Sequence, residues 1–325
     1  MTTLSDYVDG AGDLPLLGTI CINTTYDGSY EVELVQEVFQ AEGLDTSFIP
    51  SPSGAKDAFS KAITNHKETS YVLSNGHKVS IMLREMDSSN PTEYAVRALV
   101  REERSTNGES LFYDNIGEIK HYHGVRRGAG RQVDDTAARL YWGLAANSDT
   151  LALSDEERAK IRNVAIRVHN DYQRYRSSLD GKKVRAMVTS YLRHLDAIKL
   201  KDSVYFVPVA HSESVRALRV AVSHFGECTL DGIPLVDFQD QRDLIIRTFQ
   251  ADTDDAMSTL AGQLQQARAN PSAATYERLR KQYDELTTRT RTYTSTLGDS
   301  VAKTTGSHEI VKAALVALQT ELLGG

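Results

Sequence analysis

The sequence has few of the residues and segments that would mark it as secreted or membrane-bound. It has two cysteines, Cys21 and Cys228, in 325 residues, whereas disulfide frameworks belong mostly to small secreted domains. We therefore expect two free buried thiols. No apolar run approaches the roughly 18 residues of a membrane span. The acidic N-terminus, MTTLSDYVDGAGD, lacks the pattern of a secretion signal. We therefore expect a cytoplasmic protein.

Catalytic signatures are absent as well. There is no Walker loop, Rossmann fingerprint, HExxH, CxxC or GxSxG. His121 and His123 have H-x-H spacing, but no second pair of ligands accompanies them, so we expect surface histidines and no metal. Asp134 and Asp135 precede a stretch over 136–144 that we expect to be helical, and we interpret them as its N-cap. The sequence thus predicts no cofactor and leans away from an enzyme.

What is present is the composition of an ordinary globular protein, with 40% hydrophobic and 25% charged residues. Residues 16–26 form a strand-like run, and residues 30–41 and 54–64 have a helical period. Three later runs alternate apolar and polar residues and predict an antiparallel meander with one face against the helices; they span 78–86, 93–103 and 110–122. These segments predict an α/β domain over residues 1–128.

A second domain is expected over residues 129–238. Ser154 and Glu157 form a capping-box pattern, which predicts the start of a helix. That helix ends at Asp180-Gly181, and a second helix follows. Residues 197–208 then contain two short β-prone runs before a third helix over 212–226. The pattern predicts a helix pair followed by a hairpin.

The hairpin over 197–208 has two interpretations. The order helix, basic helix, hairpin is that of winged-helix modules, in which the second helix enters the major groove and the wing contacts phosphate. Alternatively, VYFVP is an internal strand of an α/β core. We favour the core, because the second helix has a buried apolar stripe and the hairpin tip, Lys201-Asp202-Ser203, carries almost no net charge.

Charge is unevenly distributed along the chain. The net charge is −7, but residues 116–202 contain 17 Lys and Arg against 11 Asp and Glu, while the rest contains 20 against 33. This basic middle region permits an anionic partner, and it equally permits docking against the acidic flanks of a neighbouring subunit. The candidate contacts to nucleic acid or another anion are Arg126, Arg127, Arg131, Arg174, Arg176, Lys182, Lys183, Arg185 and Arg193.

Neither basic cluster is specific on its own. VRRGAGRQ, which contains the first three arginines, is either a solvated linker between domains, which we favour, or a phosphate contact. Tyr172 and Tyr175 interleave with basic residues, as in surfaces that stack single-stranded nucleic acid. They also share a helical stripe with Ile161 and Val168, so we interpret both tyrosines as core residues.

Residues 239–325 predict a helical arm. Two helices, over 239–269 and 273–297, are joined at NPS, and a last amphipathic helix contains Val311 and Leu322. The second helix has heptad spacing with a thin seam. The seam positions are Tyr276, Leu279, Tyr283, Leu286, Thr290, Tyr293 and Leu297. Because so thin a stripe gains little from packing on itself, we expect the arm to pack against a second copy; an intramolecular hairpin is the alternative.

The combination of VREERSTNGESLFYDNIGEI, LDAIKLKDSVYFVPVAHSESVRALRVAVSHFG, LVDF and the coiled-coil-like hairpin resembles a family of uncharacterised proteins of bacteria, phages and plasmids. The resemblance covers roughly residues 95–290 and contains no catalytic motif. It implies a cytoplasmic protein, often carried by a phage or mobile element, without a cofactor.

These observations predict an α+β protein. The first hypothesis is a non-enzymatic interaction or assembly protein that forms a homo-oligomer through its C-terminal helices. The second is a nucleic-acid-binding protein that uses the basic middle region. An enzyme without a recognisable motif is the third, and a pocket holding titratable groups with perturbed pKa values would favour it.

Overall fold

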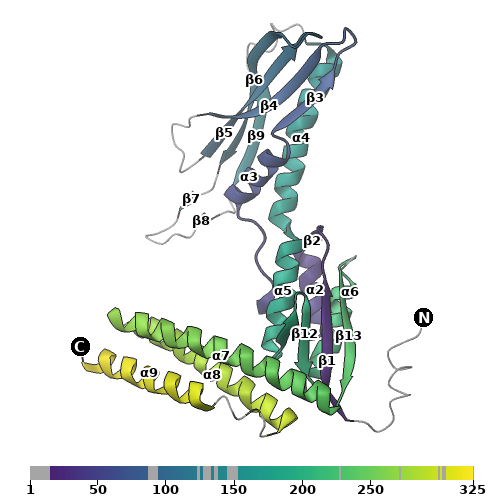
Figure 1. Ribbon diagram of the computed structural model, residues 1–325. Coiled ribbons are helices and arrows are strands. Elements are labelled where there is room, and N and C mark those ends of the chain that lie inside the picture. Colours follow the sequence, from purple (N-terminus) through teal and green to yellow (C-terminus); the bar gives the residue numbers. More distant parts are fainter. Residues whose placement is uncertain are drawn as a thin grey trace. The chain divides into compact units, whose positions relative to one another are not determined.

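The structure is a computed structural model that describes residues 15–86, 94–122, 125–126, 133–134, 138–144, 153–226, 228–270, 272–298, 301 and 305–324. The chain forms two compact units of α+β structure (Figure 1). Unit 1 comprises Met1–Gly28, Leu34–Ile49 and Gly181–Gly325; unit 2 comprises Ser29–Glu33 and Pro50–Asp180. The chain therefore crosses between the units four times, unlike the three consecutive domains expected from the sequence.

Unit 1 is built on an antiparallel sheet of four strands. Its order is β11 (Ile198–Lys201), β12 (Val204–Pro208), β1 (Leu16–Thr24) and β13 (Thr229–Val236). The hairpin over 197–208 is thus part of a core sheet, and β12 is an internal strand as favoured above. Tyr205 and Phe206 point to opposite faces of the sheet, and both are buried.

Three helices supply one side of the unit 1 core. They are α2 (Val32–Ala41), α5 (Gly181–His194) and α6 (Ser212–Ser223). Phe39 of α2 packs edge-on against Tyr191 of α5 at 6.0 Å and stacks on Phe225 after α6 at 6.4 Å. Cys21 and Cys228 are both buried and form no disulfide, as expected.

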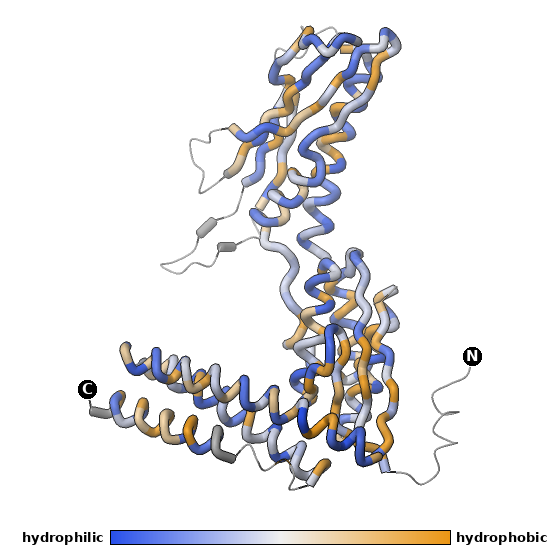
Figure 2. The backbone as a smooth tube through the Cα atoms, viewed as in Figure 1, coloured by the Kyte–Doolittle hydropathy of each residue, from blue (hydrophilic) through white to orange (hydrophobic). Residues whose placement is uncertain are grey.

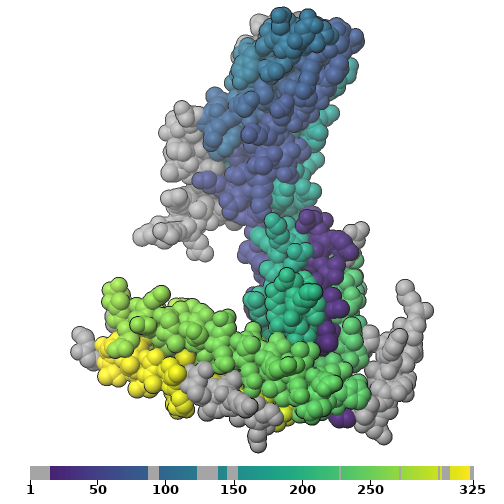
Figure 3. All heavy atoms as spheres, viewed as in Figure 1, coloured from purple at the N-terminus to yellow at the C-terminus, as the bar shows by residue number. Residues whose placement is uncertain are grey.

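The C-terminal arm of unit 1 consists of α7 (Gln239–Ala269), α8 (Ala273–Leu297) and α9 (Thr305–Gly324). The bounds of α7 and α8 match the sequence prediction. Apolar residues alternate with polar ones along these helices (Figure 2), and among the described residues no helix is long and apolar enough to cross a membrane. One cluster of the arm contains Met257, Leu279 and Val311, one from each helix. The helix α9 forms part of the outer surface of the arm (Figure 3).

Unit 2 is built on an antiparallel meander, as predicted. The strand order is β3 (Glu68–Val72), β4 (Lys78–Met86), β5 (Tyr94–Arg104), β6 (Ser110–Tyr122) and β9 (Arg139–Leu144). Two helices, α3 (Ala55–Asn65) and α4 (Asp155–Ser177), pack on one face of this sheet. A short ribbon of β2 (Ser29–Glu31) and β10 (Ser178–Asp180) belongs to the same unit.

The core between this sheet and its helices contains a histidine that the sequence reading placed at the surface. His121 is fully buried; its Nε2 lies 3.0 Å from the Tyr172 hydroxyl, and its ring stacks on Phe59 at 4.9 Å. The surface expectation was wrong because His121 shares the helix-facing side of β6 with Ile119. Tyr172 is a buried core residue, as expected, and Tyr175 packs against the same core.

The stretch over 136–144 is not helical where the structure describes it. Arg139–Leu144 forms β9, which pairs with β6. Asp134 lies in the two-residue strand β8 (Val133–Asp134), paired with β7 (Val125–Arg126), so it is no helix N-cap. Short apolar runs such as LYWGL do not distinguish strand from helix by period, and pairing with β6 decides the outcome here.

Candidate functional site

Unit 1 contains a groove of about 1300 Å³. It is lined by the C-terminal end of α5, the start of α6, the 3₁₀ turns η1 (Thr46–Phe48) and η4 (Val209–His211), and facing stretches of α7 and α8. The α/β layer thus supplies one wall and the arm supplies the other. This groove is the candidate functional site.

Asp196, in the turn between α5 and β11, is a polar residue of the groove that three other residues contact. Its Oδ2 accepts a hydrogen bond of 2.9 Å from the Thr292 hydroxyl and lies 3.1 Å from Nε2 of His211. Its backbone carbonyl accepts a hydrogen bond of 2.9 Å from the Tyr293 hydroxyl. One residue therefore joins the α/β layer to α8.

The way α5 ends explains where Asp196 lies. The amide of Ala197 bonds to the carbonyl of Leu192, and Asp196 adopts a left-handed conformation with φ of 59°. This is the Schellman arrangement, in which the left-handed position is usually glycine. A residue with a Cβ pays roughly 1–2 kcal/mol there, although aspartate is among those that tolerate it.

Arg289 joins the two arm helices to the same turn. Its guanidinium lies 2.6 Å from the Asp252 carboxylate of α7 and donates to the Ala197 carbonyl at 3.2 Å. It also lies over the rings of Phe249 and Tyr293, at 5.6 and 6.0 Å from their centroids. Burial holds the pKa of the Tyr293 phenol far above its usual range. This end of α8 is therefore anchored by apolar, ionic and hydrogen-bonding contacts together.

The far end of the α/β wall is more open. The ring of His194 lies 5.0 Å from that of Phe48. Asp45 accepts a hydrogen bond of 2.8 Å from the Ser47 amide, which lowers the pKa of its carboxyl, and His194 lowers it further. Arg193 has no ion-pair partner among the described residues. Within the described ranges no cluster of three or more His, Cys, Asp or Glu could hold a metal ion.

The residues predicted to contact nucleic acid are divided between the two units. Arg127 and Arg131 lie outside the described residues, and Arg126 is described only through its backbone in β7. In unit 2, Arg174 forms an ion pair with Asp171 at 3.0 Å, and Arg176 donates to the Tyr172 hydroxyl at 3.3 Å.

The other predicted basic residues lie along α5 in unit 1. Arg185 donates to the Thr25 carbonyl at 2.6 Å, so it holds the loop after β1. Lys182 is exposed and Lys183 is half-buried. Arg193 lines the groove. The described residues of the linear basic region are therefore divided between the two units.

The predicted seam of the arm is packed within the chain. Leu279, Tyr283 and Leu286 contribute to the cluster that α7, α8 and α9 share. Tyr276 packs at the edge of the same cluster. Tyr293 and Leu297 pack on the unit 1 sheet, against Phe206 and Phe249 among others. Self-association of the arm stays a prediction, and it has to use other faces of these helices.

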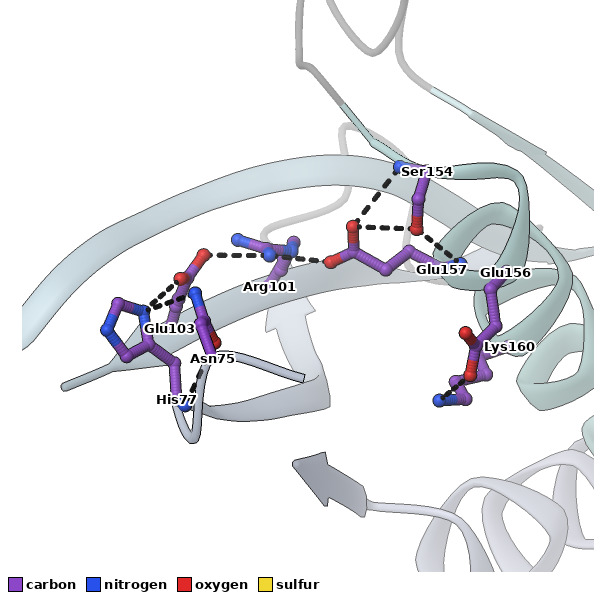
Figure 4. A network of polar contacts seen from close by, with 8 residues as sticks. All are labelled: Asn75, His77, Arg101, Glu103, Ser154, Glu156, Glu157 and Lys160. Atoms are coloured by element: carbon purple, nitrogen blue, oxygen red, sulfur yellow. Dashed lines mark hydrogen bonds and ion pairs between the residues drawn. The ribbon is translucent and has the colours of Figure 1, made fainter. Parts of the chain in front are cut away.

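A second polar cluster lies in unit 2 (Figure 4). Arg101 of β5 donates to Glu157 of α4 at 2.6 Å and to Glu103 at 2.8 Å, and Glu103 lies 2.8 Å from His77. Glu157 also completes the predicted capping box with Ser154. Because its members bond to one another, this network fixes the start of α4 on the sheet, and we assign it to stability.

A model of one protein family matches residues 16–323. The chain belongs to DUF6744, a family of unknown function. This agrees with the resemblance to an uncharacterised family noted from the sequence. No curated protein and no solved structure matches the chain significantly. Membership of DUF6744 therefore assigns no activity to the chain, and the groove of unit 1 is its candidate site.

Sequence reasoning missed the residues that define the groove. Asp196, His211 and the α8 pair Arg289 and Thr292 come from three different segments, and no motif joins them. The one local signal was an aspartate directly after a helix at the position where glycine is usual.

Proposed function

We propose that the protein is an interaction protein that binds a segment of another polypeptide in the groove of unit 1. The observation that carries this proposal is the groove's combination of size and lining. Its volume of about 1300 Å³ exceeds the roughly 300–1000 Å³ of most small-molecule pockets. Most of its lining residues are polar or charged, yet most of the surface that lines it is apolar, with Phe48, Leu195 and Leu286 among the contributors.

The charges along the groove favour a polypeptide over a nucleic acid. Three lysine or arginine side chains and four aspartate or glutamate side chains line it. Nucleic-acid affinity depends on many cations facing the phosphates, which this lining does not supply. A polypeptide offers side chains of both signs and backbone groups for the hydroxyl and amide side chains that line the walls.

The length of the walls sets the size of the segment. The lining of α8 extends from Lys281 to Arg289 and that of α7 from Ala256 to Gln263. At 1.5 Å per residue these stretches are about 12 and 11 Å long. A segment of two helical turns, or about four extended residues, fills such a wall.

Selection from a displayed peptide library against the full chain tests the proposal. We expect enrichment of short peptides that bind the wild-type chain and lose at least about tenfold in affinity with Arg193→Glu or Glu285→Lys. Fluorescence anisotropy of the enriched peptides measures the loss. The matched controls are Arg216→Glu, an exposed arginine of α6, and Glu277→Lys, an exposed glutamate of α8, neither of which lines the groove.

Two outcomes overturn the proposal. Either no peptide is enriched above the level found with an unrelated protein, or the enriched peptides bind the groove variants and the control variants equally.

We also propose self-association through the outward face of α9. One side of this helix is buried through Val311, Leu315 and Leu318. Away from that side Ile310 and Val316 are 66% and 58% exposed, and at 3.6 residues per turn they lie about 120° apart, one on each flank of the outward surface of α9. A second copy of α9 offers the same apolar face, as a twofold interface requires.

Size-exclusion chromatography with light scattering tests self-association. We expect a multiple of 36.0 kDa that falls to the monomer mass with the double variant Ile310→Glu, Val316→Glu. The control is Gln265→Glu with Gln266→Glu, the same charge change at exposed polar positions of α7. A wild-type monomer at every concentration contradicts the proposal. A peak with a high 260/280 nm absorbance ratio that salt strips down would favour nucleic-acid binding instead.

A further inference from the structure

We infer that Asp196 is the positioning residue of the groove: it holds α8 at a fixed distance from the α/β layer and couples occupancy of the groove to docking of the arm. This inference rests on the proposed function, because it concerns the same groove. It adds a residue that sets the shape of the site and a way for the bound segment to act on the arm.

The first argument is the conformation of Asp196. Its φ of 59° lies where glycine is usual at the end of a helix. A residue other than glycine at such a position indicates a role for its side chain, because a strained backbone conformation persists only where surrounding contacts compensate for it. The carboxylate is the compensation, since it is bonded by residues of both walls, Thr292 from α8 and His211 from η4.

The second argument is the convergence of α8 on this turn. Thr292 bonds the Asp196 carboxylate, Tyr293 bonds the Asp196 carbonyl and Arg289 bonds the Ala197 carbonyl. All three donors lie within about one turn of helix, which begins at Arg289, the last residue of α8 that lines the groove. The spacing between the walls at this end therefore depends on the turn.

The third argument concerns what a bound segment would touch. Asp196 itself lines the groove, its side chain is 17% exposed, and the described residues give its Oδ1 no hydrogen bond. That oxygen is free to accept a bond from a backbone amide or a lysine or arginine of the segment. A segment that bonds Asp196 only while α8 is docked stabilises the docked arm, and by linkage the docked arm raises affinity for the segment.

Hydrogen exchange of the full chain without any peptide tests the positioning role. In Asp196→Gly the left-handed backbone is kept and the carboxylate is lost; in Thr292→Val only the hydroxyl is lost. We expect amides of residues 286–297 to exchange at least about tenfold faster in both variants, because each loses a hydrogen bond to or from a charged group.

Two matched controls separate this effect from general damage. Thr288→Val removes a hydroxyl one turn earlier on α8, where no hydrogen bond from that hydroxyl is found among the described residues. Asp171→Asn alters a carboxylate of unit 2 that likewise lies 3.1 Å from a histidine Nε2 and is 19% exposed. Neither should change exchange in residues 286–297. Unchanged exchange in both Asp196→Gly and Thr292→Val overturns the positioning role.

The coupling is tested with a peptide enriched in the library selection as the probe. We expect it to slow exchange of residues 286–297 in the wild-type chain and to do so at least about fivefold less in Asp196→Gly at saturating peptide. Equal protection in both chains overturns the coupling. Failure of the selection overturns the proposed function alone, because the exchange of the peptide-free variants is measured without it.

Discussion

The carboxylate of Glu157 lies 2.6 Å from the guanidinium of Arg101, and less than one tenth of either side chain is exposed. The pair joins α4 to β5 across the core of unit 2. Removing one member of a buried ion pair leaves the other charged, desolvated and alone, which costs far more than the pair itself contributes.

Replacing Arg101 with methionine should therefore lower the free energy of unfolding of unit 2 by about 3–5 kcal/mol. Urea denaturation followed by circular dichroism measures it. The control is Lys160→Met: Lys160 pairs with Glu156, whose side chain is 76% exposed, and such surface pairs contribute about 0.5 kcal/mol. Equal losses in the two variants would show that the Arg101 pair is not the source of the stability.

Acid should weaken unit 2 through the same network. Burial raises the pKa of Glu157, but the hydrogen bonds from Arg101 and the Ser154 amide outweigh it and leave the pKa below its ordinary value. The hydrogen bond from His77 lowers the pKa of Glu103. Both carboxylates therefore contribute stability that is present above the ordinary glutamate range and is lost as pH falls through their lowered pKa values.

Urea midpoints measured from pH 7 down to pH 3 follow this loss. In Glu157→Gln, which no longer titrates, the dependence on pH below about 4.5 should be shallower than in the wild-type chain. A wild-type and a variant profile of equal slope would contradict the assignment.

The arm should respond to pH in a higher window. Burial lowers the pKa of His308 in α9, against the opposing effect of Asp254 and Glu309, and its Nε2 lies 3.2 Å from the Thr290 hydroxyl. The unfolded chain binds the proton more readily, so docking of α9 contributes stability present above about pH 6.5 and lost as pH falls through the lowered pKa.

Hydrogen exchange of α9 between pH 7.5 and 5, corrected for intrinsic rates, measures the change. We expect His308→Gln to abolish it and His224→Gln, at an exposed histidine after α6, to leave it intact. If the pH dependence of exchange in α9 persists in His308→Gln, another titrating group is its cause.

Gly18 of β1 should tolerate no side chain. A Cβ there would lie 2.1 Å from the Val207 carbonyl oxygen and 2.9 Å from the Phe206 ring, so Gly18→Ala has to separate β1 from β12. We expect a loss of about 3 kcal/mol in the free energy of unfolding of unit 1, the upper end of what overpacking usually costs. Gly262→Ala is the contrasting change: Gly262 lies within α7 with open space around it, and alanine should stabilise the helix by up to about 1 kcal/mol. Comparable stability of the two variants would refute the close approach.

Local elements were predictable because their signals lie close together in sequence. The capping box at Ser154 fixed the start of α4, and apolar periodicity fixed the bounds of α7 and α8. The other elements depend on which strands and helices lie beside them in the folded chain. Arg139–Leu144 forms strand β9 because it pairs with β6. His121 is a core residue because its side of β6 packs against α3 and α4.

The site was less predictable than the fold. Asp196 and His211 are 15 residues apart and Thr292 is 96 residues from Asp196. Only the packing of α8 on the sheet brings the three side chains together, and no spacing rule contains that information. In the basic middle region the relation is reversed: its residues are close in sequence, but the boundary at Asp180 places them in different units.

The interleaved order of the two units also bears on synthesis of the chain. All residues of unit 2 precede Gly181, whereas β1 pairs with strands formed after it, Ile22 with Val204 for example. At about 5–20 residues per second, the ribosome needs roughly 10–40 s to make the intervening segment. Unit 2 is therefore synthesised in full while β1, the first strand of unit 1, still lacks the strands that pair with it. During this interval β1 is available to a chaperone that binds nascent chains, because β12 has not yet been made.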